Sequence, residues 1–278
     1  MDKNQQKTRK PVARGFYPLN KEELEKKIDK LLKSVPERNI NPKGIIVPHA
    51  GYEYSGKTAA HAYKSLKDRK IENAVILGFN HSGIGEKAAL STLPWETPLG
   101  KTEVNREIKE KILENEVIKA DESAHSQEHS IEVQLPFLQF LNPEIEITPI
   151  SLSNKISIEE IKKISETLKK IDYKKNILIA SSDLLHVGYR FNLVPEEDNL
   201  EYLNKKDEEF INSIKDLKIQ EIIEKGRKST VCGFIPIAVV LDTLKDQIKE
   251  IKVLERSNSY EVTGDKSSVV GYASIALT

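Results

Sequence analysis

The chain has 278 residues, of which 38% are hydrophobic and 31% are charged, so it has enough apolar residues for a real core. Lysine plus arginine and aspartate plus glutamate both number 43, and this balance argues against a nucleic-acid or membrane partner. The single cysteine excludes an intrachain disulfide, and no apolar signal core or membrane-length apolar run is found, which indicates a reducing, cytoplasmic setting.

The predicted elements begin after a polar segment, residues 1–12, which we expect to be flexible. Asn20 followed by Glu23 is typical of a capping box that opens a helix to about Val35, and Ser157 with Glu160 forms a second such pattern. Apolar runs predict strands at 44–48, 73–79, 88–93, 145–152, 176–181, 250–255 and 268–277. Helical periodicity predicts helices at 55–67, 105–115, 129–141, 157–171, 198–214 and 235–246.

Strands and helices alternate, and several strands are unbroken apolar runs, which is typical of strands buried on both faces. No repeat or Pro/Gly linker divides the chain. We therefore predict a single α/β domain over residues 13–278, with a central mixed, largely parallel sheet flanked by helices. Ligands of such sheets bind beyond the carboxyl ends of the strands, and His49, His81, Asp183 and His186 all follow predicted strand ends. We expect these four side chains to share one site.

Two histidines stand in similar surroundings, each after an apolar run and beside small residues that let a ligand approach the backbone. Taken alone, His49 and His81 are as often structural as functional, but together they are typical of metal-binding imidazoles. Cys232 precedes an apolar helix, where a cysteine is either a small buried hydrophobe or a thiolate that acts as nucleophile or metal ligand. A set of two histidines and one cysteine would favour copper, zinc or iron over magnesium or calcium.

Three further residues are candidates for acid–base chemistry. If the loop is helical, Asp183 and His186 share one turn, and the carboxylate can orient the imidazole as a general acid or base; the alternative is that Asp183 only caps the segment. His129 precedes an apolar helix, whose N-terminus would suit either a neutral proton-transferring imidazole or a purely structural residue. We interpret His61 as a helix-surface or packing residue and His125 as a loop residue. The chain has no GxSxG, P-loop, GxGxxG or HExxH motif, which argues against serine hydrolases, nucleotide-binding folds and zincins.

Eight segments, in order and spanning nearly the whole chain, resemble the Memo family, named after a mediator of cell motility. They are ARGFYP (13–18), VPHAGYEYSG (47–56), GFNHSG (78–83), WETPLG (95–100), EHSIEVQLPFLQ (128–139), SSDLLHVG (181–188), VCGFIPI (231–237) and GYASIAL (271–277). The resemblance implies a fold similar to that of class III extradiol dioxygenases, with a metal cleft at the strand ends. It implies that His49, His81 and Cys232 bind the metal, that Asp183 and His186 line the same cleft, and that His129 matches an active-site histidine of the related dioxygenases.

The cysteine distinguishes this set from that of extradiol dioxygenases, which bind iron(II) through two histidines and a carboxylate. A thiolate is softer and oxidisable, which favours copper or a redox-labile iron and argues against ring cleavage. We predict a non-haem iron- or copper-dependent oxidoreductase, with zinc as a third option for the ion. Its catalytic residues would be His186, Asp183 and His129, and its substrate a small molecule, phenols included, or a peptide.

Two alternatives stay open at this point. The first is a metal carrier without turnover, or a module that binds a peptide or protein partner. The second is a hydrolase in which Cys232 is the nucleophile and His186 the base.

Overall fold

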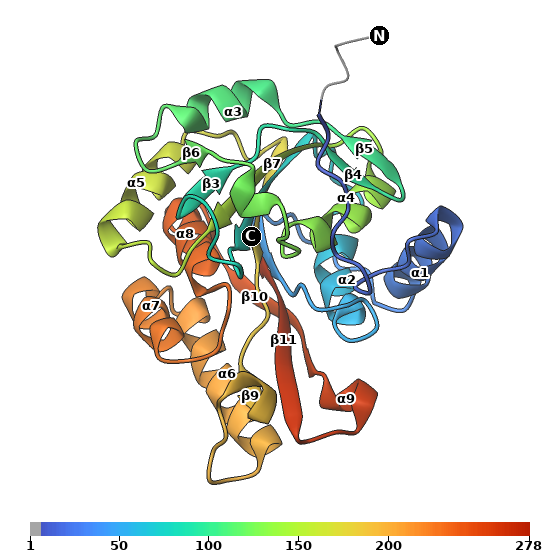
Figure 1. The fold of residues 1–278 in the computed structure, drawn as a ribbon, viewed down its shortest axis with the longest axis vertical. Helices are drawn as coiled ribbons and strands as arrows, with labels where there is room; N and C mark the ends of the chain where they lie inside the picture. Colours follow the sequence, from blue (N-terminus) through green and yellow to red (C-terminus); the bar gives the residue numbers. More distant parts are fainter. Residues whose placement is uncertain (1–6) are drawn as a thin grey trace.

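The apolar runs form a single nine-stranded sheet in the computed structural model, which describes residues 7–278 (Figure 1). The strand order is β10-β11-β1-β8-β2-β7-β3-β6, and β9 pairs with β11. These strands are β1 (Gly44–Val47), β2 (Asn73–Phe79), β3 (Ala88–Leu90), β6 (Lys119–Ala120), β7 (Glu146–Leu152), β8 (Asn176–Ser181), β9 (His186–Gly188), β10 (Ile251–Asn258) and β11 (Ser268–Leu277). A separate hairpin is formed by β4 (Trp95–Thr97) and β5 (Gly100–Thr102).

The centre of the sheet is parallel and its edges are mixed. Strands β1, β8, β2 and β7 run parallel, whereas β11 and β3 flank them in antiparallel pairing. Along β1, Ile46 faces one hydrophobic core and its neighbours Ile45 and Val47 face the other. Because a central strand is buried on both faces, its sequence is a continuous apolar run. The predicted mixed, largely parallel sheet is confirmed.

Helices cover both faces of this sheet (Figure 1). One core packs against α1 (Lys21–Lys33), α2 (Gly56–Lys64) and α4 (Leu135–Leu141); the other packs against α3 (Arg106–Leu113), α5 (Ile158–Leu168), α6 (Asn199–Lys215), α7 (Ile219–Arg227) and α8 (Phe234–Leu244). All eleven residues of α8 are buried. Figure 1 shows α9 (Tyr260–Thr263) at the tip of the β10–β11 hairpin. None of the helices in residues 7–278 has the length and apolar character needed to cross a membrane.

The short elements differ most from the prediction. Strands β4, β5, β6 and β9 and helices α7 and α9 were not expected, and the helix predicted from residue 129 begins only at Leu135, after a 3-10 turn at Glu132–Gln134. Pro136 lies in the first turn of α4, where its missing N–H costs no intrahelical hydrogen bond. The capping box of Ser157 and Glu160 is confirmed in both directions, with N–O distances of 3.2 and 2.9 Å.

The N-terminal segment is anchored earlier than predicted. Residues 1–6 of the expected flexible segment, 1–12, lie outside the described residues, but Arg9 is only 8% exposed. Its backbone N–H donates to Pro94 O at 2.8 Å, and its guanidinium lies 4.0 Å from the centre of the Trp95 ring. The guanidinium also pairs with the buried carboxylate of Glu132. Within the predicted flexible segment, Arg9 is therefore anchored by a carboxylate more than a hundred residues away.

Candidate metal centre

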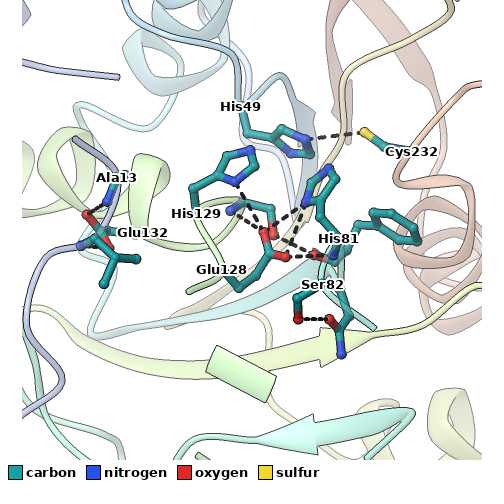
Figure 2. Close-up of polar contacts among 12 residues, drawn as sticks. Ala13, His49, His81, Ser82, Glu128, His129, Glu132 and Cys232 are labelled. Atoms are coloured by element: carbon teal, nitrogen blue, oxygen red, sulfur yellow. Dashed lines mark hydrogen bonds and ion pairs between the residues drawn. The ribbon is translucent and has the colours of Figure 1, made fainter. Parts of the chain in front are cut away.

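Three donor side chains meet at the carboxyl edge of the parallel strands (Figure 2). His49 follows β1, His81 follows β2, and Cys232 immediately precedes the first turn of α8. Because β1 and β2 are parallel to β8, which lies between them, their carboxyl ends lie at the same edge of the sheet, one strand apart. One ligand atom from each of the three residues lies within 4.8 Å of the others, and His49 Nε2 is 3.2 Å from Cys232 Sγ. The structure thus brings together the three residues that were predicted as a metal-binding set, which we call the triad.

Hydrogen bonds fix the tautomer of His49. The Ser181 hydroxyl donates its only proton to Ser130 O at 2.6 Å and accepts from Gln134 Nε2 at 2.8 Å. Its contact with His49 Nδ1 at 3.0 Å must therefore be a second accepted hydrogen bond, so Nδ1 carries the proton. Burial lowers the pKa of His49 well below its usual value and keeps the ring neutral. The lone pair on Nε2 consequently faces Cys232.

His81 is oriented by Glu128, which sequence reasoning missed. The Glu128 carboxylate accepts from the His81 backbone N–H at 2.7 Å, from Nδ1 at 2.9 Å and from the Ser130 N–H at 2.8 Å. Burial would raise the pKa of Glu128, but the hydrogen bonds and charges of its neighbours outweigh burial and lower the pKa to about 2. An ionised carboxylate can only accept, so Nδ1 of His81 carries a proton, and Nε2 is the ring nitrogen left to bind a metal ion.

Cys232 is placed by a close approach between α8 and the end of β8. A Cβ atom at Gly233 would lie 2.4 Å from Ser182 Cβ and 2.7 Å from Ser181 O, so only glycine lets the start of α8 come this near. The Gly233 N–H donates to Ser182 Oγ at 3.0 Å. Burial, and next the charge of Asp183, raise the pKa of the Cys232 thiol. A thiol in these surroundings is protonated at neutral pH unless a cation replaces the proton.

His129 lies beside the triad in a stack of rings. Its ring centroid is 4.6 Å from that of His81, with 20° between the planes (Figure 2). On the Phe16 side, the two ring centroids are 4.4 Å apart. Its Nδ1 is 3.7 Å from the nearest Glu128 oxygen, which is too long for a good hydrogen bond. A second group of side chains that could bind a metal consists of His129, His81 and Glu128. The Glu128 oxygens, however, already accept hydrogen bonds from three N–H donors.

Asp183 and His186 line the same cleft, but not as the predicted pair on a helical turn. The loop after β8, residues 182–185, forms no helical turn, and the Asp183 carboxylate accepts from the backbone N–H groups of His49 and Ala50 at 2.8 and 3.2 Å. The His186 ring is oriented instead by the Leu184 carbonyl, 3.0 Å from Nδ1. The prediction that Asp183 orients the His186 ring is therefore wrong. A carbonyl can only accept, so Nδ1 holds the proton and Nε2 of His186 is free to accept another.

These residues border a cleft of about 470 Å³ with several aromatic walls, which we call the aromatic cleft. Its lining includes His49, His81, His129, Asp183, His186, Arg14, Phe16, Tyr54 and Phe191. A larger hollow of about 810 Å³ lies at the opposite, amino ends of the strands, around Asp68, Arg69 and Lys174, and contains none of the predicted site residues. The volume of a hollow is thus a poorer guide here than the side chains that line it.

A buried carboxylate on α6 supports the loop that carries Asp183 and His186. Asp207 accepts from the Leu185 N–H at 3.0 Å, and it packs so closely that a Cβ atom at Gly271 would lie 1.8 Å from its Oδ2. Burial raises the pKa of Asp207 from 3.8 to about 7. Between these two values the unfolded chain has lost the proton while the folded chain still holds it, so stability falls as the pH rises from about 4 to 7.

We expect Asp207→Asn to remove this pH dependence, since the amide resembles the protonated acid and keeps the acceptor for Leu185. At pH 8 the variant should be more stable than the wild type by an amount on the order of 1–4 kcal/mol, because one pKa unit corresponds to about 1.4 kcal/mol. Urea unfolding of both proteins at pH 5 and pH 8 measures the difference. Parallel pH profiles of the two proteins would contradict the assignment.

The two remaining histidines are structural, as interpreted from the sequence. His61 is buried in α2, with Nε2 3.2 Å from a carboxylate oxygen of Glu255. His125 is fully buried, with Nε2 3.1 Å from Ala89 O and its ring edge against Trp95. Burial lowers the pKa of His125 to about 4. Neither ring reaches the triad.

Comparison with known proteins places the chain among similar sequences over nearly its full length. The family model described as "Memo-like protein" matches residues 9–276. A MEMO1 family protein of Methanosarcina barkeri is 39% identical, with 97% of this chain and 99% of the relative covered. A MEMO1 family protein of Aquifex aeolicus is 40% identical, with 96% and 97% covered. Among solved structures, an uncharacterized protein from Escherichia coli K12 has the same fold with a TM-score of 0.57 at 10% identity, over 84% of this chain and 99% of that one.

Proposed function

The chain belongs to the Memo family, and on that premise we propose that it binds one transition-metal ion through His49, His81 and Cys232 and acts as an oxidoreductase. The observation that carries the proposal is the convergence of two imidazole lone pairs and one thiol within 4.8 Å of one another. Both imidazoles are held from behind, by Ser181 and by Glu128, as metal-binding histidines usually are.

The donor set fits a borderline or soft metal rather than magnesium or calcium, which need oxygen ligands. Iron or copper suits the oxidoreductase proposal, and zinc would bind the same donors without redox chemistry. When bound, the ion would supply Lewis acidity and, for iron or copper, a change of oxidation state. The protein would contribute two neutral imidazoles, a thiolate formed by loss of the Cys232 proton, and a partly buried setting.

The substrate that fits the aromatic cleft is a small molecule with a ring, such as a phenol. Phe16, Tyr54 and Phe191 offer apolar walls, and His129 lies between Phe16 and His81. His186 is a suitable proton acceptor, because Leu184 O holds its Nδ1 proton and burial lowers the pKa of the ring, which leaves Nε2 neutral. His129 would donate or accept a hydrogen bond at the substrate, and Asp183 would hold the His49 backbone in place.

The hydrolase alternative has less support. A nucleophilic cysteine needs a lowered pKa, whereas burial raises that of Cys232. The imidazole in contact with its sulfur is His49, not His186. A metal carrier uses the same triad and differs only in the absence of turnover.

The test is oxygen consumption with a panel of phenols after anaerobic reconstitution with iron(II) or copper. We expect metal-dependent turnover that falls at least about 100-fold in His49→Ala. Removing the metal with a chelator should abolish this turnover. His61→Ala, which removes a histidine outside the cleft, should behave as the wild type. Tight metal without turnover would instead indicate a carrier. In a separate assay, hydrolysis of an ester or amide that survives chelation but not thiol alkylation would indicate the hydrolase.

A further inference from the structure

The triad borders a second hollow of about 740 Å³ on the side away from His49, which we call the basic hollow. Cys232 lines this hollow, whereas His49, His129 and Asp183 line the aromatic cleft; His81, His186 and Phe191 line both. Its outer wall is formed by the loop after β7, with Asn154 and Lys155, and by the end of α7, with Arg227. A molecule in the basic hollow would therefore meet Cys232 and His81 of the triad, and one in the aromatic cleft would meet His49 and His81.

The charge of the basic hollow is one-sided. Its lining contains Lys155 and Arg227 but no aspartate or glutamate. Within residues 7–278, neither cation forms an ion pair with a carboxylate, although many of the other lysines do, such as Lys163 with Glu116 and Lys225 with Glu221. In a chain whose 43 positive and 43 negative residues balance, two uncompensated cations on one hollow attract an anion.

Arg227 is held so that it faces the hollow with donors to spare. It is the last residue of α7, and the preceding Gly226 packs so tightly that a Cβ atom there would lie 2.1 Å from the Phe234 ring. One guanidinium nitrogen, Nη2, donates to Ile156 O at 2.9 Å. A guanidinium has five N–H donors in a planar fork, so the others remain for a carboxylate or phosphate.

The N-terminus of α8 adds to the positive potential. Phe234, the first residue of this eleven-residue helix, lines the basic hollow together with the two residues Val231 and Cys232. The cap residue is Gly233, which has no side chain to satisfy the first N–H groups, those of Phe234 and Ile235; the third residue, Pro236, has no N–H. Helix N-termini favour anions through these free donors and the helix dipole. Two cations and a helix N-terminus thus surround the same space.

We propose that the basic hollow binds the anionic oxygen group, carboxylate or phosphate, of a small organic acid. Lys155 and Arg227 are the residues that bind the anion, and the bound acid lies against Cys232 and His81. The anion site itself requires no metal; its role as the selector of an acidic substrate or co-substrate rests on the proposed function of the triad.

The test is calorimetric titration of the metal-free full-length protein with glutarate and, separately, with inorganic phosphate. We expect saturable binding of at least one of the two, at least about tenfold weaker in the double variant Lys155→Gln/Arg227→Gln, where tenfold corresponds to about 1.4 kcal/mol. The neutral diamide of glutarate should not bind. The double variant Lys26→Gln/Lys30→Gln, which removes from α1 two cations that pair with no carboxylate in residues 7–278, is the charge-matched control and should bind as the wild type.

The relative affinities for glutarate and phosphate show whether the site prefers a carboxylate or a phosphate. Equal affinities in the two double variants, or no saturable binding of either anion by the wild type, would overturn the proposal. Thermal unfolding of each variant shows whether a loss of affinity results from a loss of the folded structure. Repeating the titration with metal-loaded protein separates the two proposals. If the anion binds only to metal-loaded protein, and equally well in the Lys155→Gln/Arg227→Gln variant, it binds the metal ion, and the proposed anion site is refuted. If the anion binds without metal and the protein shows no metal-dependent turnover, the anion site is supported and the proposed oxidoreductase activity is refuted.

Discussion

Replacing Glu132 by alanine is expected to destabilise the protein by about 3–5 kcal/mol, the cost of leaving a buried charge without its partner. That is a large share of the roughly 5–15 kcal/mol by which a domain of ordinary stability is folded. Glu132 is fully buried, and its carboxylate accepts from the Val12 and Ala13 N–H groups at 2.9 Å each. It also pairs with the Arg9 guanidinium and accepts from the Tyr17 hydroxyl.

The same carboxylate ties the N-terminal segment to the cleft. Arg9, which Glu132 neutralises, donates to Glu128 O at 2.6 Å and to His125 O at 3.2 Å. Phe16, four residues after Val12, stacks on His129. Loss of Glu132 should therefore loosen one wall of the aromatic cleft as well as lower the free energy of unfolding.

Urea unfolding compares the variant with the wild type and with Glu110→Ala, which removes an exposed glutamate of α3 that pairs with the exposed Arg106. The control should change the stability by no more than about 0.5 kcal/mol. In the double variant Arg9→Ala/Glu132→Ala the loss should be smaller than the sum of the two single losses, because the two side chains interact directly. A Glu132→Ala protein as stable as the control would refute the role given to this carboxylate.

Replacing Glu128 by glutamine is expected to weaken metal binding about 10–100-fold, the usual effect of losing the partner that orients a metal-binding histidine. The amide keeps the size of the side chain but has a single acceptor oxygen, whereas the carboxylate serves three N–H donors on both oxygens. His81 would lose the acceptor that holds its proton on Nδ1, or its backbone anchor, or both.

Affinities for this comparison come from competition with a coloured chelator. Glu122→Gln is the matched control, since Glu122 lies in the same segment and accepts from Ser91 and Thr92 but touches neither His49 nor His81. It should leave the affinity unchanged. Equal affinities for wild type and Glu128→Gln would show either that His81 binds the metal without the hydrogen bond from its Nδ1 to Glu128, or that His81 is not a metal ligand.

The sequence predicts the centre of the fold better than its periphery. Strands such as β1 and β8 are apolar throughout because both faces are buried, and this local signal is strong. Strands β6 and β9 have two and three residues and exist only through their partners, so no local pattern could show them. Helix α7 begins after Leu217, which has a φ of 54° that leucine rarely adopts, so the turn before it has no glycine to mark it.

The site shows the same division between local and distant signals. His49 and His81 stand at strand ends, and topology alone brings such positions to one edge. Their supports come from other parts of the chain: Ser181 lies 132 residues from His49, and Glu128 lies 47 residues from His81. The one sequence feature that pointed to Glu128 was its position next to His129. The spacing of Asp183 and His186 fits one turn of a helix, but residues 182–185 form no helical turn, and Asp183 binds the backbone N–H groups of His49 and Ala50 instead of the His186 ring.

Metal content after anaerobic purification tests the central claim most directly. Wild type, Cys232→Ser, His49→Ala and the control His61→Ala would be measured by elemental analysis, with and without reconstitution by iron(II), copper or zinc. The triad predicts about one equivalent of a transition metal in the wild type and in His61→Ala, and near none in the other two. Metal retained in both Cys232→Ser and His49→Ala, or absent from every sample after reconstitution, would contradict the assignment of the triad.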